Sequence, residues 1–241
     1  MENVYFHSKH PSDEQLSEAA AFFSANYGVW GQSAVENMGP SMKIGARVKI
    51  SPKLLRKKIL PDGGDNTFIS TARGNELLGI LFATRWMYKG KSILWVTQLC
   101  VHLEYRNEGI AKGLLSALNT NEDYAIGILS SHPFSISAVA RVFGNGLEDV
   151  DLYTMRLEAR DIMATCPVTY VRDAKLRGSL FEHEPEDGTL SCADTQFWVD
   201  HREPDEALNL IKEKGRLWPF GHLPEGHEYL LLVKLKRVAA P

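Results

Sequence analysis

A positively charged loop lies between an apolar segment and a helical pattern near the middle of this 241-residue sequence. The segment Trp95–Val101 is apolar, and the loop after it carries Arg106 and Lys112 on either side of Gly109. Backbone N–H groups at the start of a helix lack partners and lie at the positive end of the helix dipole, so they attract anions. Because Gly109 and Ala111 have little side chain, an anion can approach the backbone closely. The loop is therefore expected to bind a phosphate or a pyrophosphate.

The loop also has a recognisable spacing. Arg106, Gly109 and Ala111 form Arg-x-x-Gly-x-Ala, and the strand before them ends in LCVHLEY. This pattern resembles the signature of the GCN5-related N-acetyltransferase (GNAT) superfamily, in which an (Arg/Gln)-x-x-Gly-x-(Gly/Ala) loop holds the pyrophosphate of acetyl-coenzyme A. The resemblance covers roughly residues 1–146. It departs from the family at Asn107, where many members have glycine.

The resemblance implies that acetyl-CoA is the co-substrate. The backbone near Leu99–Val101 would pair with the pantetheine arm like an added strand, which tolerates varied side chains. A bulge in the same place would direct a backbone N–H at the thioester carbonyl and stabilise the oxyanion. The residues expected to contact coenzyme A are Leu99, Cys100, Val101, Arg106, Asn107, Glu108, Gly109, Ile110, Ala111, Lys112, Ser137 and Arg141.

The sequence does not identify a general base at the position that the family usually uses. An amine must be deprotonated before it attacks a thioester, and many family members use a Glu on the strand before the loop. Trp95 stands near that position, and residues 94–103 contain no carboxylate. The alternatives for the base are Gln98 with an ordered water, His102, Glu104 or a group from the C-terminal half.

The sequence also lacks the residue that usually protonates the leaving thiolate in the family. A Tyr often has this role in the family, but Phe143 lies about where it would be, so His132 becomes the candidate proton donor. Cys100 lies within an apolar strand, where a thiol is usually inert, so direct transfer is expected. The spacing of His and Cys residues indicates no metal site.

The order of the strands and helices that would position these residues predicts an α+β protein. The resemblance identifies a GNAT-like acyl-CoA N-acyltransferase fold, with a central, mixed, mostly antiparallel sheet flanked by helices. One domain is expected over residues 1–241, with an acetyl-CoA-binding core at 1–146 and C-terminal strands and insertions at 147–241, on the acceptor side. Strands are expected at residues 4–7, 67–72, 77–86, 92–101, 124–131, 195–199 and 229–235. Helices are expected at residues 12–28, 52–59, 109–118, 135–143 and 203–214. Residues 159–164 and 168–177 could form either a helix or a strand.

Composition limits the partners of this chain. Its 44% apolar and 24% charged residues are typical of a soluble protein, and no apolar run is long enough for a membrane span. A net charge of −3 disfavours a broad nucleic-acid surface. Residues 1–120 carry 14 Lys and Arg against 10 Asp and Glu, whereas residues 121–241 carry 13 against 20, a balance that could attract an amine. Three widely spaced cysteines favour a reducing compartment, the cytoplasm or alternatively the nucleus.

These features together predict an acetyl-CoA-dependent N-acetyltransferase that acts directly on a primary amine, on a small molecule, as a monomer or homodimer. One alternative is an acyltransferase that acts on a protein amine or a hydroxyl group, or that uses another acyl donor. A second alternative is a catalytically inactive sensor or scaffold that binds coenzyme A. A third is a nucleotide-binding module of unrelated fold.

Overall fold

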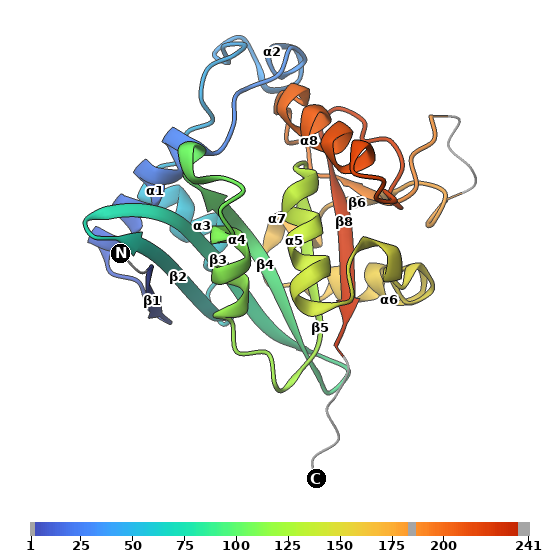
Figure 1. The fold of residues 1–241 in the computed structure, drawn as a ribbon, viewed down its shortest axis with the longest axis horizontal. Coiled ribbons are helices and arrows are strands. Elements are labelled where there is room, and N and C mark those ends of the chain that lie inside the picture. Colours follow the sequence, from blue (N-terminus) through green and yellow to red (C-terminus); the bar gives the residue numbers. More distant parts are fainter. Residues whose placement is uncertain (1–2, 183–186, 236–241) are drawn as a thin grey trace.

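The computed structural model describes residues 3–182 and 187–235 of the chain. A single eight-stranded sheet of order β1-β2-β3-β4-β5-β8-β7-β6 runs through the molecule (Figure 1). Its neighbouring strands are antiparallel except β4 and β5, which are parallel. The expected α+β class and mostly antiparallel sheet are therefore confirmed. The strands are β1 (Val4–Ser8), β2 (Asp65–Arg73), β3 (Glu76–Tyr88), β4 (Lys91–Val101), β5 (Asp123–Ser130), β6 (Lys175–Arg177), β7 (Cys192–Asp194) and β8 (His227–Lys234).

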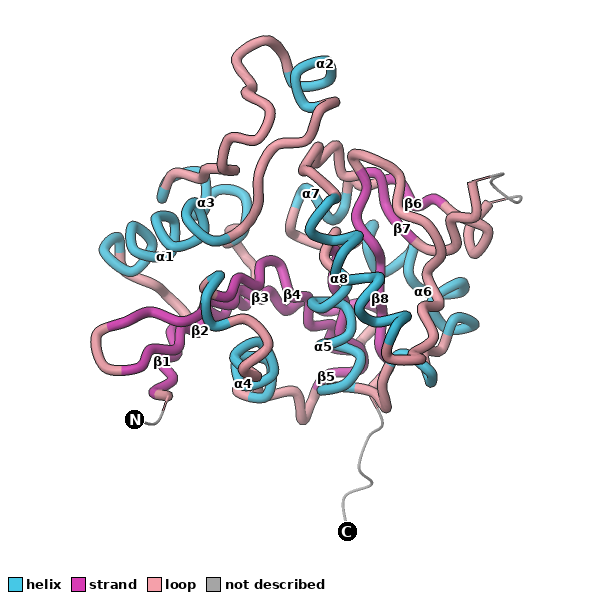
Figure 2. Tube along the Cα trace, turned by 45° about the horizontal axis from the view of Figure 1, so that its top comes forward, coloured by secondary structure: helices cyan, strands magenta, loops and turns pink. Residues whose placement is uncertain are grey.

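Helices cover both faces of the sheet. In Figure 2, α1 and α3 lie on one face, and α4 and α5 lie on the other. The helix α8 packs beside α5. The helices are α1 (Asp13–Asn26), α2 (Ala34–Met38), α3 (Pro52–Ile59), α4 (Ile110–Ser116), α5 (Pro133–Phe143), α6 (Leu152–Ala164), α7 (Thr169–Arg172) and α8 (Arg202–Glu213), with short 3-10 turns at Leu103–Tyr105 and Leu147–Asp149.

The C-terminal half differs most from the sequence-based expectation. The prediction of a strand at 195–199 was wrong, because the sheet uses Cys192–Asp194 instead. Gln196 has a φ of 56°, which interrupts an extended strand, and Val199 forms only an isolated bridge to Trp30. The ambiguous segment 159–164 is the second half of α6, whose first turn is capped by Asp151 through a 2.9 Å bond from the Thr154 N–H.

The only parallel pair of the sheet separates partway along its length. Pairing of β4 with β5 ends at Val96 and Ile128, although β4 continues to Val101 and β5 to Ser130. On its other side, β4 stays paired with β3, but the register of this pair shifts. Gln98 lies opposite Phe82, whereas Val96 lies opposite the next residue of β3, Ala83. The extra residue at this bulge is residue 97. The sheet thus opens on one side of β4 just where its backbone bulges.

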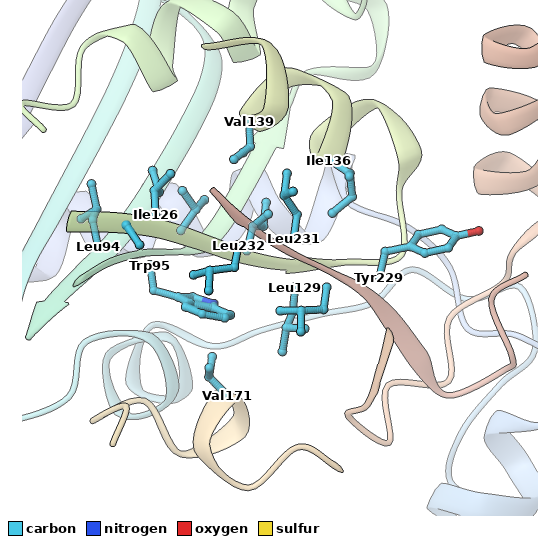
Figure 3. Packing of buried hydrophobic residues seen from close by; sticks show 14 of the residues in the cluster. Leu94, Trp95, Ile126, Leu129, Ile136, Val139, Val171, Tyr229, Leu231 and Leu232 are labelled. Carbon is cyan, nitrogen blue, oxygen red and sulfur yellow. The ribbon is translucent and has the colours of Figure 1, made fainter. Parts of the chain in front are cut away.

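Buried side chains next to this opening hold β4 and β5 together. Trp95 is fully buried, and Figure 3 shows its ring on the same side of the sheet as Val171 of α7, whereas Ile136 and Val139 of α5 lie on the other. A Cβ at Gly127 would lie 2.2 Å from the Trp95 ring, so the indole packs directly on the β5 backbone. Trp95 is therefore a core residue.

Candidate active site

A cavity of about 680 Å³ lies where β4 and β5 separate. Its walls come from the ends of these two strands, the loop before α4, the first turns of α5, residues 27–29 and the α8 region. Seven Lys or Arg residues line it, against three Asp or Glu residues. The basic residues are Arg47, Arg106, Lys112, Arg141, Arg202, Lys214 and Arg216, and the acidic residues are Asp200, Glu203 and Glu206. The excess of cations suits an anionic ligand.

The loop before α4 has the open backbone that the sequence predicted. Asn107 and Gly109 both have left-handed backbones, with φ of 66° and 83°. No heavy atom lies within 4 Å of the position where a Cβ would stand on Gly109. A ligand can therefore reach the backbone at this residue without a side chain in its way.

Arg106 is fixed at the entrance of this loop. Its guanidinium donates a 2.7 Å hydrogen bond to the Asn26 carbonyl and forms an ion pair with Glu203. Burial lowers the pKa of Arg106, and the charge of Arg47 lowers it further, although a guanidinium stays protonated at neutral pH. Arg47 was missed by the sequence analysis, since it lies in an irregular segment with no motif to mark it.

Most of the residues that the sequence predicted to contact coenzyme A line the cavity. Of the residues predicted to contact coenzyme A, eleven line the cavity, which are Leu99, Cys100, Val101, Arg106, Asn107, Gly109, Ile110, Ala111, Lys112, Ser137 and Arg141. Glu108 does not line it and instead pairs with Arg73 at 3.4 Å. Burial raises the pKa of the Cys100 thiol to about 12, which leaves it an inert thiol at neutral pH, as expected.

The three predicted catalytic residues lie in different surroundings. Glu104 is exposed, and its N–H donates to His102 Nδ1 at 3.3 Å, away from the cavity lining. Gln98 is buried on β4 beside the bulge, and its Oε1 has no hydrogen-bond partner among the described residues. His132 alone of the three lines the cavity.

His132 has a defined tautomer in this structure. Its Nδ1 accepts the Phe134 N–H at 3.2 Å, which leaves Nε2 as the donor toward Glu203 at 3.3 Å. Burial, and next the charge of Arg106, lower the pKa of His132 to about 4. A neutral imidazole is a weak acid, so the predicted proton-donor role would need the ring to gain a proton on ligand binding.

Two further residues beside the opening were missed by the sequence analysis. Tyr170 of α7 donates a 2.8 Å hydrogen bond to the carbonyl of Thr97 at the bulge. Glu228 of β8 is buried, with 6% of its surface exposed. The signal for Glu228 was present, since it is a single carboxylate at the start of the otherwise apolar run EYLLLV. Tyr170 had no comparable signal, because its helix is only four residues long.

Two other features are absent from the described part of the chain. No group of three or more His, Cys, Asp or Glu residues within it could hold a metal ion. No helix in residues 3–182 and 187–235 combines the length and apolar character needed to cross a membrane.

Comparisons with known proteins place the chain among distant structural neighbours. No family model and no curated protein matches it. It is similar to an aminoglycoside acetyltransferase from an uncultured soil metagenomic sample, at 15% identity and a TM-score of 0.41, over 61% of this chain and 91% of that chain. It is also similar to the ribosomal-protein-S18-alanine N-acetyltransferase from Escherichia coli (10% identity, TM-score 0.37, 58% of this chain and 76% of that chain).

A third similar structure is an acetyltransferase of the GNAT family from Streptococcus pneumoniae, at 12% identity and a TM-score of 0.39, over 58% of this chain and 82% of that chain. All three of these proteins are described as acetyltransferases.

Proposed function

We propose that this protein is an acetyl-CoA-dependent N-acetyltransferase of the GNAT superfamily, and that its acceptor is a primary amine on a small molecule. The observation that carries the proposal is the separation of β4 from β5 beyond Val96, beside the loop Arg106–Lys112. This arrangement puts an unpaired strand edge and a cluster of cations in one cavity. An elongated ligand with a peptide-like arm and a phosphate end fits both features.

The residues of the cavity suit each part of acetyl-CoA. The edge at Leu99–Val101 offers backbone groups to the amides of the pantetheine arm. Arg106 and Arg47 offer charge to the pyrophosphate, and the open face of Gly109 lets it approach the backbone. Lys112 and Arg141 line the same cavity and suit the nucleotide end. The bound thioester would supply the activated acetyl group.

An aromatic cluster next to the cavity supports a small-molecule acceptor. The ring of Phe197 lies 5.8 Å from that of Tyr27 and 5.7 Å from that of Trp30. Tyr27 also lines the cavity. Aromatic side chains provide a rigid, partly polar wall for a compact ligand. The excess of acidic residues in the C-terminal half supports an acceptor that carries positive charge.

One observation favours a second candidate function. The position where many GNAT enzymes carry their base is taken by the buried Trp95, and His132 is neutral in this structure. A protein that binds acetyl-CoA as a sensor, without transferring the acetyl group, is consistent with both facts. Binding and turnover therefore need separate measurements.

The test is a thermal unfolding series with acetyl-CoA, with ATP and NAD as controls, followed by thiol release with a panel of primary amines. A ligand at a hundred times its dissociation constant adds about 2.7 kcal/mol, or about 5–10 °C in Tm for a chain of this size. A shift with acetyl-CoA alone, with amine-dependent thiol release, is the expected result. A shift without release would favour the sensor, and equal shifts with ATP or NAD would contradict the proposal.

A further inference from the structure

Glu228 differs from every other carboxylate in the described part of the chain. Only two carboxylates there are buried, Asp123 and Glu228. Asp123 is neutralised by Arg85, through contacts of 2.7 and 2.9 Å, and accepts a hydrogen bond from Ser92 at 2.6 Å. Glu228 forms no ion pair within residues 3–182 and 187–235. A buried carboxylate without a cation is costly, so such residues are concentrated at functional sites.

The sheet places Glu228 on β8, across β5 from the opening between β4 and β5. Its neighbour Tyr229 pairs with Ser130, the last residue of β5, so Glu228 lies one residue beyond the end of that strand. It shares a face of β8 with Leu230 and not with Tyr229, whose side chain points toward the α5 side in Figure 3. Glu228 therefore lies on the face that α1 and α7 cover.

Two buried phenols, those of Tyr27 and Tyr170, have pKa values that respond to the charge of Glu228. Tyr27 follows α1, and Tyr170 belongs to α7; burial raises the pKa of both, and the charge of Glu228 raises each further. Tyr27 is also affected by Cys100 of β4, and both of these residues line the cavity. Tyr27 therefore connects the surroundings of Glu228 with the cavity. Burial raises the pKa of Glu228 itself to about 7.

We propose that Glu228 is the general base that takes a proton from the acceptor amine, in place of the carboxylate that β4 lacks. This role rests on the proposed function, since it needs an amine and a thioester at the opening between the strands. A base is most effective when its pKa is close to the working pH, and the buried position of Glu228 provides this condition.

The proton and electron balance of the step is complete. The acceptor ammonium gives one proton to Glu228 and becomes a neutral amine. The nitrogen lone pair forms a bond to the thioester carbon, and the carbon–sulfur bond breaks with its electron pair leaving on sulfur. The second proton of the former ammonium goes to the thiolate, which gives the free thiol and the amide. Glu228 then releases its proton to solvent.

The test compares Glu228→Gln with Glu225→Gln, an exposed carboxylate three residues away that serves as the control. Calorimetry measures the Kd for acetyl-CoA, and thiol release with the amine panel gives kcat and its pH profile. We expect Glu228→Gln to lower kcat by about 100-fold or more, with Kd unchanged, and to remove the rise in kcat/KM near pH 7. Glu228→Asp keeps the carboxylate and should retain more activity than Glu228→Gln.

The outcomes separate this role from the proposed function. A folded Glu228→Gln variant with a kcat and pH profile like those of the Glu225→Gln variant would overturn the role of Glu228 alone. A wild-type protein that binds acetyl-CoA but releases no thiol with any amine would overturn both the role and the transferase proposal. If Glu228→Gln does not fold, the wild-type protein provides the test, because a kcat/KM that shows no rise near pH 7 would overturn the role.

Discussion

Glu203 of α8 forms an ion pair with Arg106, the arginine of the loop that resembles a pyrophosphate-binding motif. The same carboxylate lies 3.3 Å from His132 Nε2. A side chain from the C-terminal half thus supplies an anion beside Arg106 in the cavity. Because a phosphate group would bind the same guanidinium, we expect Glu203 and the ligand to compete for Arg106.

Glu203→Gln should therefore bind acetyl-CoA more tightly than the wild-type protein. The ion pair is partly exposed, so its removal is expected to lower Kd by about three- to fivefold, which corresponds to somewhat under 1 kcal/mol. Glu206→Gln is the matched control, since Glu206 lines the cavity from the same helix. Calorimetry on the three proteins checks this. Equal Kd values for both variants would show that the Glu203 carboxylate does not oppose binding.

Arg106→Ala should weaken acetyl-CoA binding. Loss of a charge-assisted hydrogen bond costs about 1.5–3 kcal/mol, which is a rise in Kd of about 10- to 150-fold. Arg172→Ala is the control, because Arg172 is a partly exposed arginine on α7 that pairs with Asp173 at 3.0 Å. The rise should be smaller at high salt, where ionic contacts contribute less. A Kd for Arg106→Ala equal to that of Arg172→Ala would exclude Arg106 from the binding site.

Most of the N-terminal half could be predicted from the sequence, because its signals are local. Ser12 and Gln15 form the capping box that begins α1, with bonds of 2.9 and 3.2 Å. The turn chemistry of residues 73–75 and 89–91 separates the strands of the meander correctly. The region after residue 146 was harder to predict, because β6 and β7 are only three residues long. They depend on long-range pairing, since β7 pairs with β8 and β6 pairs with β7.

The lining of the cavity was predictable where the family resemblance marks it, at the loop before α4 and at Ser137 and Arg141 of α5. The loop Arg106–Lys112 carries its own motif, and most of its residues line the cavity. Arg47, Glu203 and Glu228 come from distant segments, and no spacing in the sequence connects them. The bridge between Val29 and Arg47, the pairing of β8 with β5 and the packing of α8 against α5 bring these segments together.

Added bulk in the first turn of α4 should block the cavity without straining the backbone. Ala111 lines the cavity from a helical position, whereas any side chain at Gly109 would have to adopt a φ of 83°. Ala111→Trp is expected to abolish the Tm increase with acetyl-CoA while the ligand-free protein stays folded. Ala164→Trp, on the exposed end of α6, is the control and should keep the increase. An undiminished increase in Ala111→Trp would mean that acetyl-CoA binds elsewhere.

The buried carboxylate of Glu228 should also give the protein a distinctive dependence of stability on pH. Its pKa is about 7 in the folded state, against an ordinary value of 4.5, so the folded state holds the proton more tightly than the unfolded state does. The stabilisation is fully present below pH 4.5 and is lost as the pH rises through 7. The shift corresponds to about 3 kcal/mol, as an order of magnitude.

Glu228→Gln removes this titration, so its free energy of unfolding relative to wild type should increase as the pH rises from 4.5 to above 7. Urea unfolding of both proteins across this range measures the difference. Glu225→Gln is the control, because Glu225 is an exposed carboxylate three residues away. A constant difference for Glu228→Gln would mean that the pKa of Glu228 is not raised in the folded state, and this would exclude Glu228 as a base near neutral pH.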